Sequence, residues 1–133
     1  LEAYSTPQEA DIYIICVPTP FHKNSQLPTP NIDFVRAAVK SISSFIKLGD
    51  MVILESTSPV GTTRMISDVL KKSGANTSDI FIAYCPERVL PGKIMVELVE
   101  NARVIGGIDT KSTEAVAKFY SSFVNGEILE LRK

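Results

Sequence analysis

The sequence predicts an α/β fold in which a mostly parallel sheet carries helices on both faces. Short apolar runs rich in β-branched residues alternate along the chain with stretches whose apolar residues recur at helical spacing. The connections contain the proline, glycine and hydroxyl residues that are typical of loops. Strands that alternate with helices indicate β-α crossovers, and therefore parallel strands covered by helices. The 133 residues, 44% of them hydrophobic, suit one globular domain.

Five apolar runs are the expected strands. The first run, IYIICV, and the second, MVILE, have no polar face, which favours strands buried on both sides. The other three are each bounded by glycine, proline or polar residues. In chain order the expected strands are residues 12–17, 51–55, 80–84, 103–107 and 127–131.

Four helices are expected between these strands. The first is marked by Asn31, a residue favoured at helix N-termini, and by a stop at Gly49. The second and fourth are recognised by apolar residues that recur on one helical face, and the short third helix is expected after the loop at 84–92. They are expected from Asn31 to about Leu48, from the loop at 55–63 to about Lys72, near 93–100, and from Thr110 or Ser112 to the stop at Gly126.

Three loops leave the carboxyl ends of successive strands. They are VPTP at residues 17–20, ESTSPVGTT at 55–63 and YCPERVLPG at 84–92. In open α/β sheets, ligands bind beyond the carboxyl ends of the strands. The sequence therefore predicts one ligand site formed by these three loops.

The loop ESTSPVGTT places hydroxyl side chains and a glycine at the start of a helix. Unpaired N–H groups and the helix dipole favour phosphate or ribose oxygens there, and Ser56, Thr57 and the following threonines supply further donors. A purely local interpretation is that Ser58 caps a helix whose first residue is Pro59. The loop by itself favours the ligand only slightly.

The other two loops are stiffened by proline. VPTP restrains the backbone on either side of Thr19, which suits contact with a cofactor, although a stiff strand exit explains the motif equally well. In YCPERVLPG, two prolines flank a segment that presents Glu87 and Arg88. A carboxylate fixed in a crevice can act as a general base, and an arginine fork suits phosphate or carboxylate. The alternative is a solvated ion pair between neighbours.

The charge balance and cysteine count narrow the classes of partner. Fourteen basic and fifteen acidic residues give a net charge of −1, which provides no basic surface for nucleic acid or an anionic membrane. No apolar run is long enough to span a bilayer. Cys16 and Cys85 are too few for a disulfide framework or a zinc site, so no metal and a reducing cytoplasm are expected. Nothing beside Cys85 in the sequence would activate it as a nucleophile.

The motifs VPTPF, GDMVILESTSPVGTT, IAYCPERVLPGKIMVELVEN and RVIGG, in this order, resemble the UDP-glucose/GDP-mannose dehydrogenase family of nucleotide-sugar dehydrogenases. The resemblance covers nearly the whole chain and is greatest to the branch that acts on UDP-N-acetyl-D-mannosamine. It implies a Rossmann-type domain, of which residues 1–133 would be the second half. The chain is thus expected to be an incomplete NAD-binding domain.

Members of this family use two NAD to oxidise the C6 alcohol of the sugar to a carboxylate, through intermediates on a catalytic cysteine. The resemblance implies that Glu87 is the acid/base that assists thioester hydrolysis, and that Thr57 lies near the reacting C6. The cofactor contacts implied for this sequence are Thr19, Ser56, Thr57 and Thr63. The nucleotide-sugar contacts implied are Arg88, Val89 and Leu90.

Some of the family pattern is altered or lies outside this sequence. The UDP-glucose branch has a second glutamate where this chain has Pro91, and the usual NDRVIGG reads NARVIGG, with Ala102. The glycine-rich turn is expected before Leu1, and the catalytic lysine, asparagine and cysteine after Lys133. The 133-residue chain alone is therefore expected to be inactive.

The expected function is NAD-dependent oxidation of a UDP-N-acetylhexosamine for surface polysaccharide synthesis. The alternatives are a standalone nucleotide-binding or interaction module, and a different UDP-sugar specificity. The strand at 12–17 would pair with the first strand of the other half of the domain, and without it would expose an apolar edge. A homo-oligomer, formed through this edge, is therefore also expected.

Overall fold

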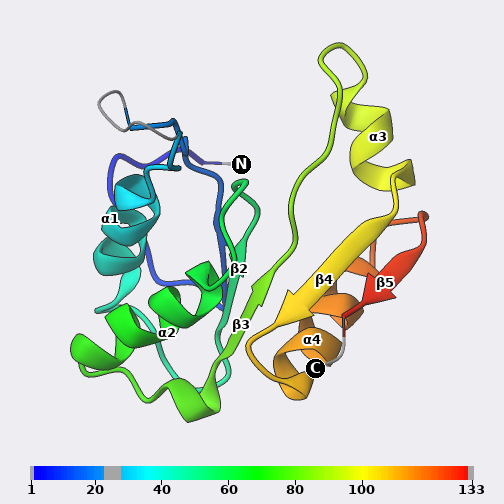
Figure 1. Cartoon of the computed structure of the whole chain (residues 1–133). Helices are drawn as coiled ribbons and strands as arrows, with labels where there is room; N and C mark the ends of the chain where they lie inside the picture. Colours follow the sequence, from blue (N-terminus) through cyan, green and yellow to red (C-terminus); the bar gives the residue numbers. More distant parts are fainter. Residues whose placement is uncertain (1, 23–27, 132–133) are drawn as a thin grey trace.

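A computed structural model of the chain describes residues 2–22 and 28–131. Residues 23–27, between the first expected strand and the first expected helix, lie outside these ranges. Within them the chain forms one five-stranded sheet and four α-helices (Figure 1). The strands are β1 (Ile12–Ile15), β2 (Met51–Leu54), β3 (Phe81–Tyr84), β4 (Arg103–Gly107) and β5 (Ile128–Glu130). The helices are α1 (Asp33–Ile42), α2 (Thr62–Lys72), α3 (Ile94–Glu100) and α4 (Thr110–Tyr120), with a 3-10 turn, η1, at Thr77–Asp79.

The sheet is mostly parallel, as predicted. Its strands lie in chain order, and β1, β2 and β3 are parallel neighbours. The chain then reverses, because β4 pairs antiparallel with β3, with Tyr84 opposite Gly106. The last strand, β5, runs parallel to β4. This reversal brings the beginning of β4 to the edge of the sheet at which β2 and β3 end.

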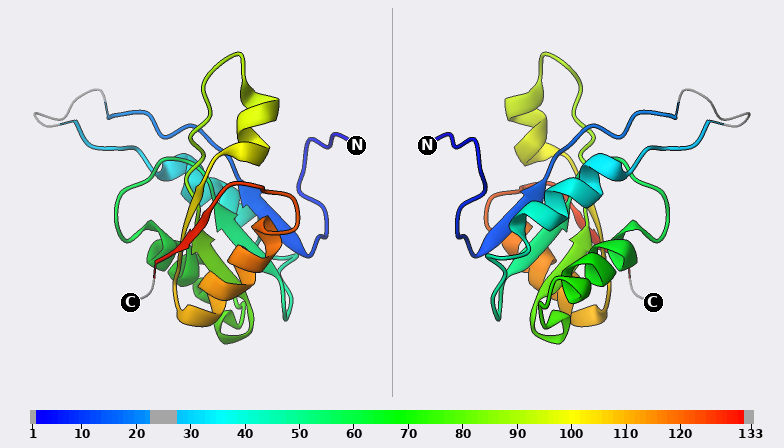
Figure 2. Two further views of the ribbon diagram at one scale, coloured as in Figure 1. Left: turned by 90° about the vertical axis from the view of Figure 1, so that its right-hand side faces the viewer. Right: turned by 90° about the vertical axis from the view of Figure 1, so that its left-hand side faces the viewer.

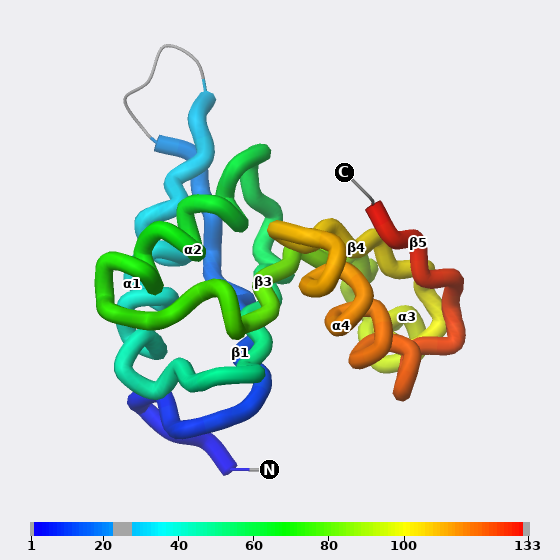
Figure 3. Tube along the Cα trace, turned by 90° about the horizontal axis from the view of Figure 1, so that it is seen from below, coloured from blue at the N-terminus to red at the C-terminus, as the bar shows by residue number. Residues whose placement is uncertain are grey.

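Helices cover both faces of the sheet, which confirms the predicted α/β class. Figure 3 shows α1 and α2 on one side of the strands and α4 on the other. The alternation of side chains along β2 divides its apolar residues between two cores: Val52 and Leu54 pack on the α1–α2 side, and Met51 and Ile53 pack on the α4 side. The helix α3 instead projects beyond the sheet, at the edge where β3 ends (Figure 2).

The strand β1 differs from the prediction, because it is buried on one face only. Tyr13 and Ile15 are buried, whereas Ile12 and Ile14 are 36% and 44% exposed. The physical reason is position: β1 is an edge strand, and α4 packs over β3 and β4 without covering it.

The first helix is shorter than predicted. It ends at Ile42 rather than near Leu48, and the hydroxyls of Ser41 and Ser43 there donate to main-chain carbonyls three residues earlier. Such bonds compete with helical hydrogen bonding. The helix begins at Asp33 with Ile32 as its N-cap, so Asn31 lies one residue before the capping position; its side chain still accepts a hydrogen bond of 2.8 Å from the main-chain N–H of Asp33.

The local interpretation of the loop before α2 is wrong. Ser58 does not cap a helix that begins at Pro59, because its hydroxyl donates to the main-chain carbonyl of Ser56 at 2.9 Å. The helix begins three residues later, after Gly61 turns the chain with a φ of 94°. The peptide N–H groups of this loop are therefore not all arranged as a first helical turn.

Gly107, at the end of β4, is tightly enclosed. A Cβ atom there would lie 2.4 Å from the main-chain nitrogen of Thr113, whereas at the neighbouring Gly106 it would meet only the Leu131 side chain, at 3.7 Å. We predict that Gly107→Ala lowers the free energy of unfolding by about 2 kcal/mol, because backbone must shift. Gly106→Ala is the matched control and should change it by less than about 0.5 kcal/mol. Equal effects in chemical denaturation would contradict this account.

The exposed edge at β1 also gives a prediction. We expect the 133-residue chain to self-associate with increasing concentration, because an unpaired strand with Ile12 and Ile14 exposed can pair with another chain. Small-angle scattering over a wide concentration range measures this. Ile14→Lys should weaken the association, whereas Leu48→Lys, at an exposed position outside the sheet, should not. A strictly monomeric profile at all concentrations would count against this expectation.

Candidate functional site

The exits of three parallel strands are joined by main-chain hydrogen bonds that continue beyond the strand ends. The N–H of Glu55 donates to Ile15 at 3.0 Å, and the N–H of Cys85 donates to Leu54 at 3.0 Å. One step further, the N–H of Glu87 donates to the carbonyl of Glu55 at 3.3 Å. The three loops predicted to form a site therefore leave the same edge of the sheet side by side.

The residues proposed for cofactor contact meet where the first two loops touch. The Thr19 hydroxyl donates to the carbonyl of Thr57 at 2.7 Å. The Ser56 hydroxyl accepts from the N–H of Val17 at 2.7 Å and donates to the carbonyl of Ile15 at 3.2 Å, so its one proton is already used to join β1 to β2. The hydroxyl of Thr57 makes no hydrogen bond within residues 2–22 and 28–131, and its residue is exposed. Thr57 is therefore the residue of this group best placed to donate to a ligand.

Thr63 lies apart from that cluster. It lines a cavity of about 310 Å³ together with Pro59, Tyr84 and Gly107, between the start of α2 and the end of β4. Thr19 and Thr57 do not line this cavity. The structure thus brings Thr19, Ser56 and Thr57 together, and their roles, like that of Thr63, stay predictions.

Glu87 is held by hydrogen bonds at both carboxylate oxygens. Its Oε1 accepts from the N–H of Arg88 at 2.7 Å, and its Oε2 forms an ion pair with Nη1 of Arg103. Arg103, the first residue of β4, is only 2% exposed. Arg103 was not among the predicted site residues, and neither was Glu55, which follows β2.

Strand register explains why Glu87 and Arg103 meet. Ala83 lies opposite Gly107 and Tyr84 opposite Gly106, so continuing this antiparallel register brings Glu87 opposite Arg103. Side-chain alternation places Ala83 and Cys85 on the α4 face, and Glu87 follows two residues later. The sequence does show an arginine as the first residue of an apolar strand, which is unusual. Glu87 can be identified as the partner of this arginine only when β4 is known to run antiparallel to β3.

Glu55 is satisfied by two uncharged donors. The Tyr120 hydroxyl donates to its Oε1 at 2.5 Å, and the Cys16 thiol donates to its Oε2 at 3.3 Å. Burial raises the pKa of the Tyr120 hydroxyl, and the hydrogen bond to Glu55 raises it further. Desolvation likewise raises the pKa of the Cys16 thiol to about 12, with the hydrogen bond and negative charge of Glu55 adding to the effect. Both groups therefore remain protonated donors near neutral pH.

Burial also acts on the other groups of this cluster. It opposes the charge of Arg103, but the hydrogen bond and charge of Glu87 outweigh it, so the pKa of the guanidinium is raised. The pKa of the buried Cys85 thiol is raised mainly by desolvation. Cys85 is therefore an inert thiol, as expected from the sequence.

The segment predicted to contact a nucleotide sugar folds back on β4 and α3. Nη2 of Arg88 donates to the carbonyl of Ala102 at 2.9 Å, and the N–H of Leu90 donates to Glu97 at 2.7 Å. Arg88 and Leu90 are exposed and Val89 is partly buried. The turn is thus fixed in place while two of its three predicted contact residues face solvent.

The side chains at the carboxyl ends of these strands suit the polar groups of a dinucleotide. The uncommitted hydroxyl of Thr57 and the Thr19 oxygen match ribose and phosphate groups, which need donors and acceptors of this kind. Among the described residues, no three histidine, cysteine or acidic side chains come close enough together to hold a metal ion. In the same residues no helix combines the length and apolar character needed to cross a membrane.

Comparison with known proteins identifies the fold and the cofactor. Residues 2–124 match the NAD-binding domain of the UDP-glucose/GDP-mannose dehydrogenase family. The chain belongs to this family. Its cofactor is accordingly NAD, as the sequence motifs indicated, and its mostly parallel sheet is the Rossmann-type sheet of dehydrogenase NAD-binding domains.

Curated family members of two kinds are similar to the chain. The UDP-N-acetyl-D-mannosamine dehydrogenase of Campylobacter jejuni is 46% identical over 97% of this chain and 33% of its own length. The NDP-N-acetyl-D-galactosaminuronic acid dehydrogenase of Ralstonia nicotianae is 44% identical over 97% of this chain and 32% of its own length. The chain therefore spans about a third of the length of these relatives.

A solved family structure has the same fold. The UDP-N-acetyl-mannosamine dehydrogenase of Staphylococcus aureus superposes with a TM-score of 0.90 at 40% identity, covering 98% of this chain and 32% of that one. A GDP-mannose dehydrogenase superposes with a TM-score of 0.74 at 21% identity, a likeness of fold alone. The family fold thus extends over nearly all of this chain.

The environment of Cys16 predicts a slow thiol despite its exposed position. At pH 8 we expect iodoacetamide to alkylate Cys16 about 100-fold more slowly than an unperturbed thiol, because a pKa of about 12 lowers the thiolate fraction about 1,000-fold and the greater nucleophilicity of that thiolate offsets part of the loss. The rate should rise about tenfold per pH unit. Mass spectrometry of the alkylated peptide measures it. Glu55→Gln should speed the reaction, whereas Glu114→Gln on the exposed side of α4 should not, and alkylation at an ordinary rate would contradict the assignment.

Proposed function

We propose that this chain is the NAD-binding part of a nucleotide-sugar dehydrogenase that oxidises the C6 alcohol of a UDP-N-acetylhexosamine to a carboxylate. UDP-N-acetyl-D-mannosamine is the preferred substrate in this proposal. The observation that carries it is the match of residues 2–124 to the family's NAD-binding domain, with relatives named for N-acetyl-D-mannosamine and N-acetyl-D-galactosaminuronic acid nucleotides. The geometry supports it, because the three loops that carry the family motifs leave one edge of the sheet together.

The overall reaction is a four-electron oxidation. The alcohol and one water become the carboxylate, and two hydrides and three protons leave the substrate and water. Held by Thr19 and Thr57, NAD would supply the hydride acceptor for both oxidations. The chain's own contribution is to bind and orient: Thr57 presents an uncommitted hydroxyl beside Thr19, and Glu87 presents a fixed carboxylate at the next strand exit. We assign Thr57 to cofactor and sugar contact and Glu87 to proton transfer to or from water.

The remaining predicted residues form the rest of the proposed site. Arg88, Val89 and Leu90 would bind the nucleotide sugar, since they lie on the turn anchored by Glu87. Ser56 would shape the cofactor crevice through its bonds to β1, and Thr63 would contact the cofactor from the start of α2. The proposal places the reaction in the cytoplasm and its product in surface polysaccharide. Both cysteines are free, which agrees with a reducing compartment.

The proposed function is tested on the product of the complete reading frame that contains this sequence. We expect it to reduce NAD, followed by absorbance at 340 nm, with UDP-N-acetyl-D-mannosamine in preference to UDP-N-acetyl-D-galactosamine. The 133-residue chain alone should give no reduction. A reading frame of this length with nucleotide binding but no turnover would instead favour a standalone binding module.

One substitution tests the role of Glu87. In the same protein, Glu87→Gln should lower kcat by about 100-fold or more, because it removes the proton-transferring carboxylate. Glu114→Gln is the matched control, since Glu114 is an exposed glutamate on α4 away from the site. Unchanged turnover in Glu87→Gln would remove Glu87 from the mechanism without affecting the assignment to the family.

A further inference from the structure

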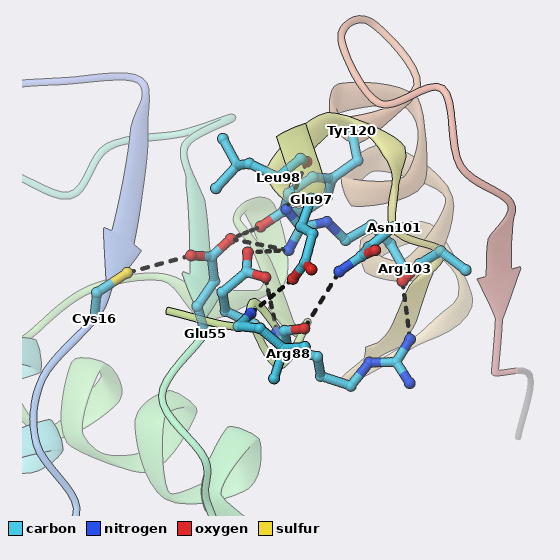
Figure 4. Close-up of polar contacts among 11 residues, drawn as sticks. Cys16, Glu55, Arg88, Glu97, Leu98, Asn101, Arg103 and Tyr120 are labelled. Carbon is cyan, nitrogen blue, oxygen red and sulfur yellow. Dashed lines mark hydrogen bonds and ion pairs between the residues drawn. The ribbon is translucent and has the colours of Figure 1, made fainter. Parts of the chain in front are cut away.

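Arg103 is a buried charge that lies between two carboxylates. Its Nη1 pairs with Oε2 of Glu87 and lies 4.0 Å from Oε1 of Glu55, while Nη2 donates to the carbonyl of Leu98 at 3.0 Å. The Tyr120 ring packs against the guanidinium, with the ring centroid 5.2 Å from its central carbon. Figure 4 shows Arg103, Tyr120 and Glu55 converging from β4, α4 and the end of β2. One cation thus serves two acidic side chains.

The uncharged donors around Glu55 decide which carboxylate this cation holds. Tyr120 and Cys16 each donate to one oxygen of Glu55, so Glu55 is satisfied without a direct bond from Arg103. The close pair of Arg103 is therefore with Glu87. Without the Tyr120 hydroxyl, Glu55 would lack its donor on the oxygen nearest Arg103 and would compete for the guanidinium.

We propose that Arg103 is a positioning residue for the dehydrogenase reaction, which orients the Glu87 carboxylate and, through it, the turn that bears Arg88. This inference rests on the proposed function. With Oε2 held by Arg103 and Oε1 held by the N–H of Arg88, the carboxylate has one orientation, and the start of the following turn is fixed with it. Tyr120 supports this arrangement indirectly. Its hydroxyl donates to Glu55, so that Glu55 does not compete with Glu87 for Arg103.

Burying Arg103 costs free energy, which indicates that the arginine does more than fill space in the core. A buried guanidinium is expensive to desolvate, and Nε of Arg103 has no hydrogen-bond partner among the described residues. An apolar residue at the head of β4 would extend the α4-side core without either penalty. An arginine instead supplies a planar fork that can hold a carboxylate and a carbonyl at defined angles.

The test compares substitutions that separate charge from orientation. In the product of the complete reading frame, Arg103→Lys keeps the charge but loses the fork, and should lower kcat about tenfold or more while KM for NAD stays within about twofold. Tyr120→Phe removes only the hydroxyl that donates to Glu55. It should lower kcat about threefold to tenfold, again with KM for NAD unchanged. Turnover is expressed per folded molecule, from the folded fraction measured by circular dichroism. Arg36→Lys on α1 is the control and should leave both constants unchanged.

The outcomes are distinguishable. A kcat for both Arg103→Lys and Tyr120→Phe within about twofold of the unaltered protein overturns the positioning role and leaves the proposed function standing. If Arg103→Lys lowers the folded fraction but leaves kcat per folded molecule unchanged, Arg103 serves stability alone, and the positioning role is again overturned. Absence of NAD reduction in the unaltered protein, with either UDP-hexosamine, overturns the proposed function and the positioning role together.

Discussion

The ion pair between Arg103 and Glu87 is the constraint on which the candidate site depends. It joins the first residue of β4 to the loop that leaves β3, and the same guanidinium lies within ion-pair distance of the residue that follows β2. Because the guanidinium is buried, its charge is weakly screened and its geometry is restricted by the packing around it. The sheet and α4 therefore fix the positions of the polar groups at the carboxyl ends of β2 and β3. The loops that follow these strands are held in place by the same groups.

The two ends of the site are built by different means. At β1 and β2, neutral hydroxyls make the connections: Ser56 bonds across to the neighbouring strand, and Thr19 bonds to the carbonyl of Thr57. At β3 and β4, the connection is the ion pair between Glu87 and Arg103. The carboxyl ends of the strands thus present neutral hydroxyls on one side and a fixed carboxylate on the other, and the proposed function assigns cofactor contact to the first and proton transfer to the second.

Most of the fold could be read from the sequence, because its signals are local. Apolar runs, helical periodicity and turn motifs located the five strands and four α-helices, though not the short 3-10 helix η1, and the βα alternation indicated the layered arrangement. The errors arose from local side-chain hydrogen bonds and from strand position, neither of which the apolar pattern shows. α1 stops at Ile42 because serine hydroxyls take over main-chain carbonyls, and the loop at Ser58 makes its own turn before α2 begins. The uneven burial of β1 depends on which strand lies at the edge, and periodicity does not encode that.

The site was predictable to the level of its loops and no further. Thr19, Thr57 and Glu87 stand in motifs beside strand ends, so their neighbourhood followed from topology. Arg103 and Tyr120 reach the same place from distant parts of the chain, and Glu55 gained its importance only from contact with them. Such long-range contacts require the direction of β4 and the packing of α4, both of which are properties of the folded sheet.

The register between β3 and β4 also limits how the chain can change in length. Facing residues alternate between the two cores, so Ala83, Cys85 and Glu87 share a face only while their spacing is kept. Deleting or inserting a single residue between Tyr84 and Glu87 would exchange the faces, turning the acid away from Arg103 and leaving a buried cation without its anion. A change of two residues would keep the face but would move the acid about 7 Å along β4, away from Arg103. The ion pair therefore requires the present spacing between the end of β3 and Glu87.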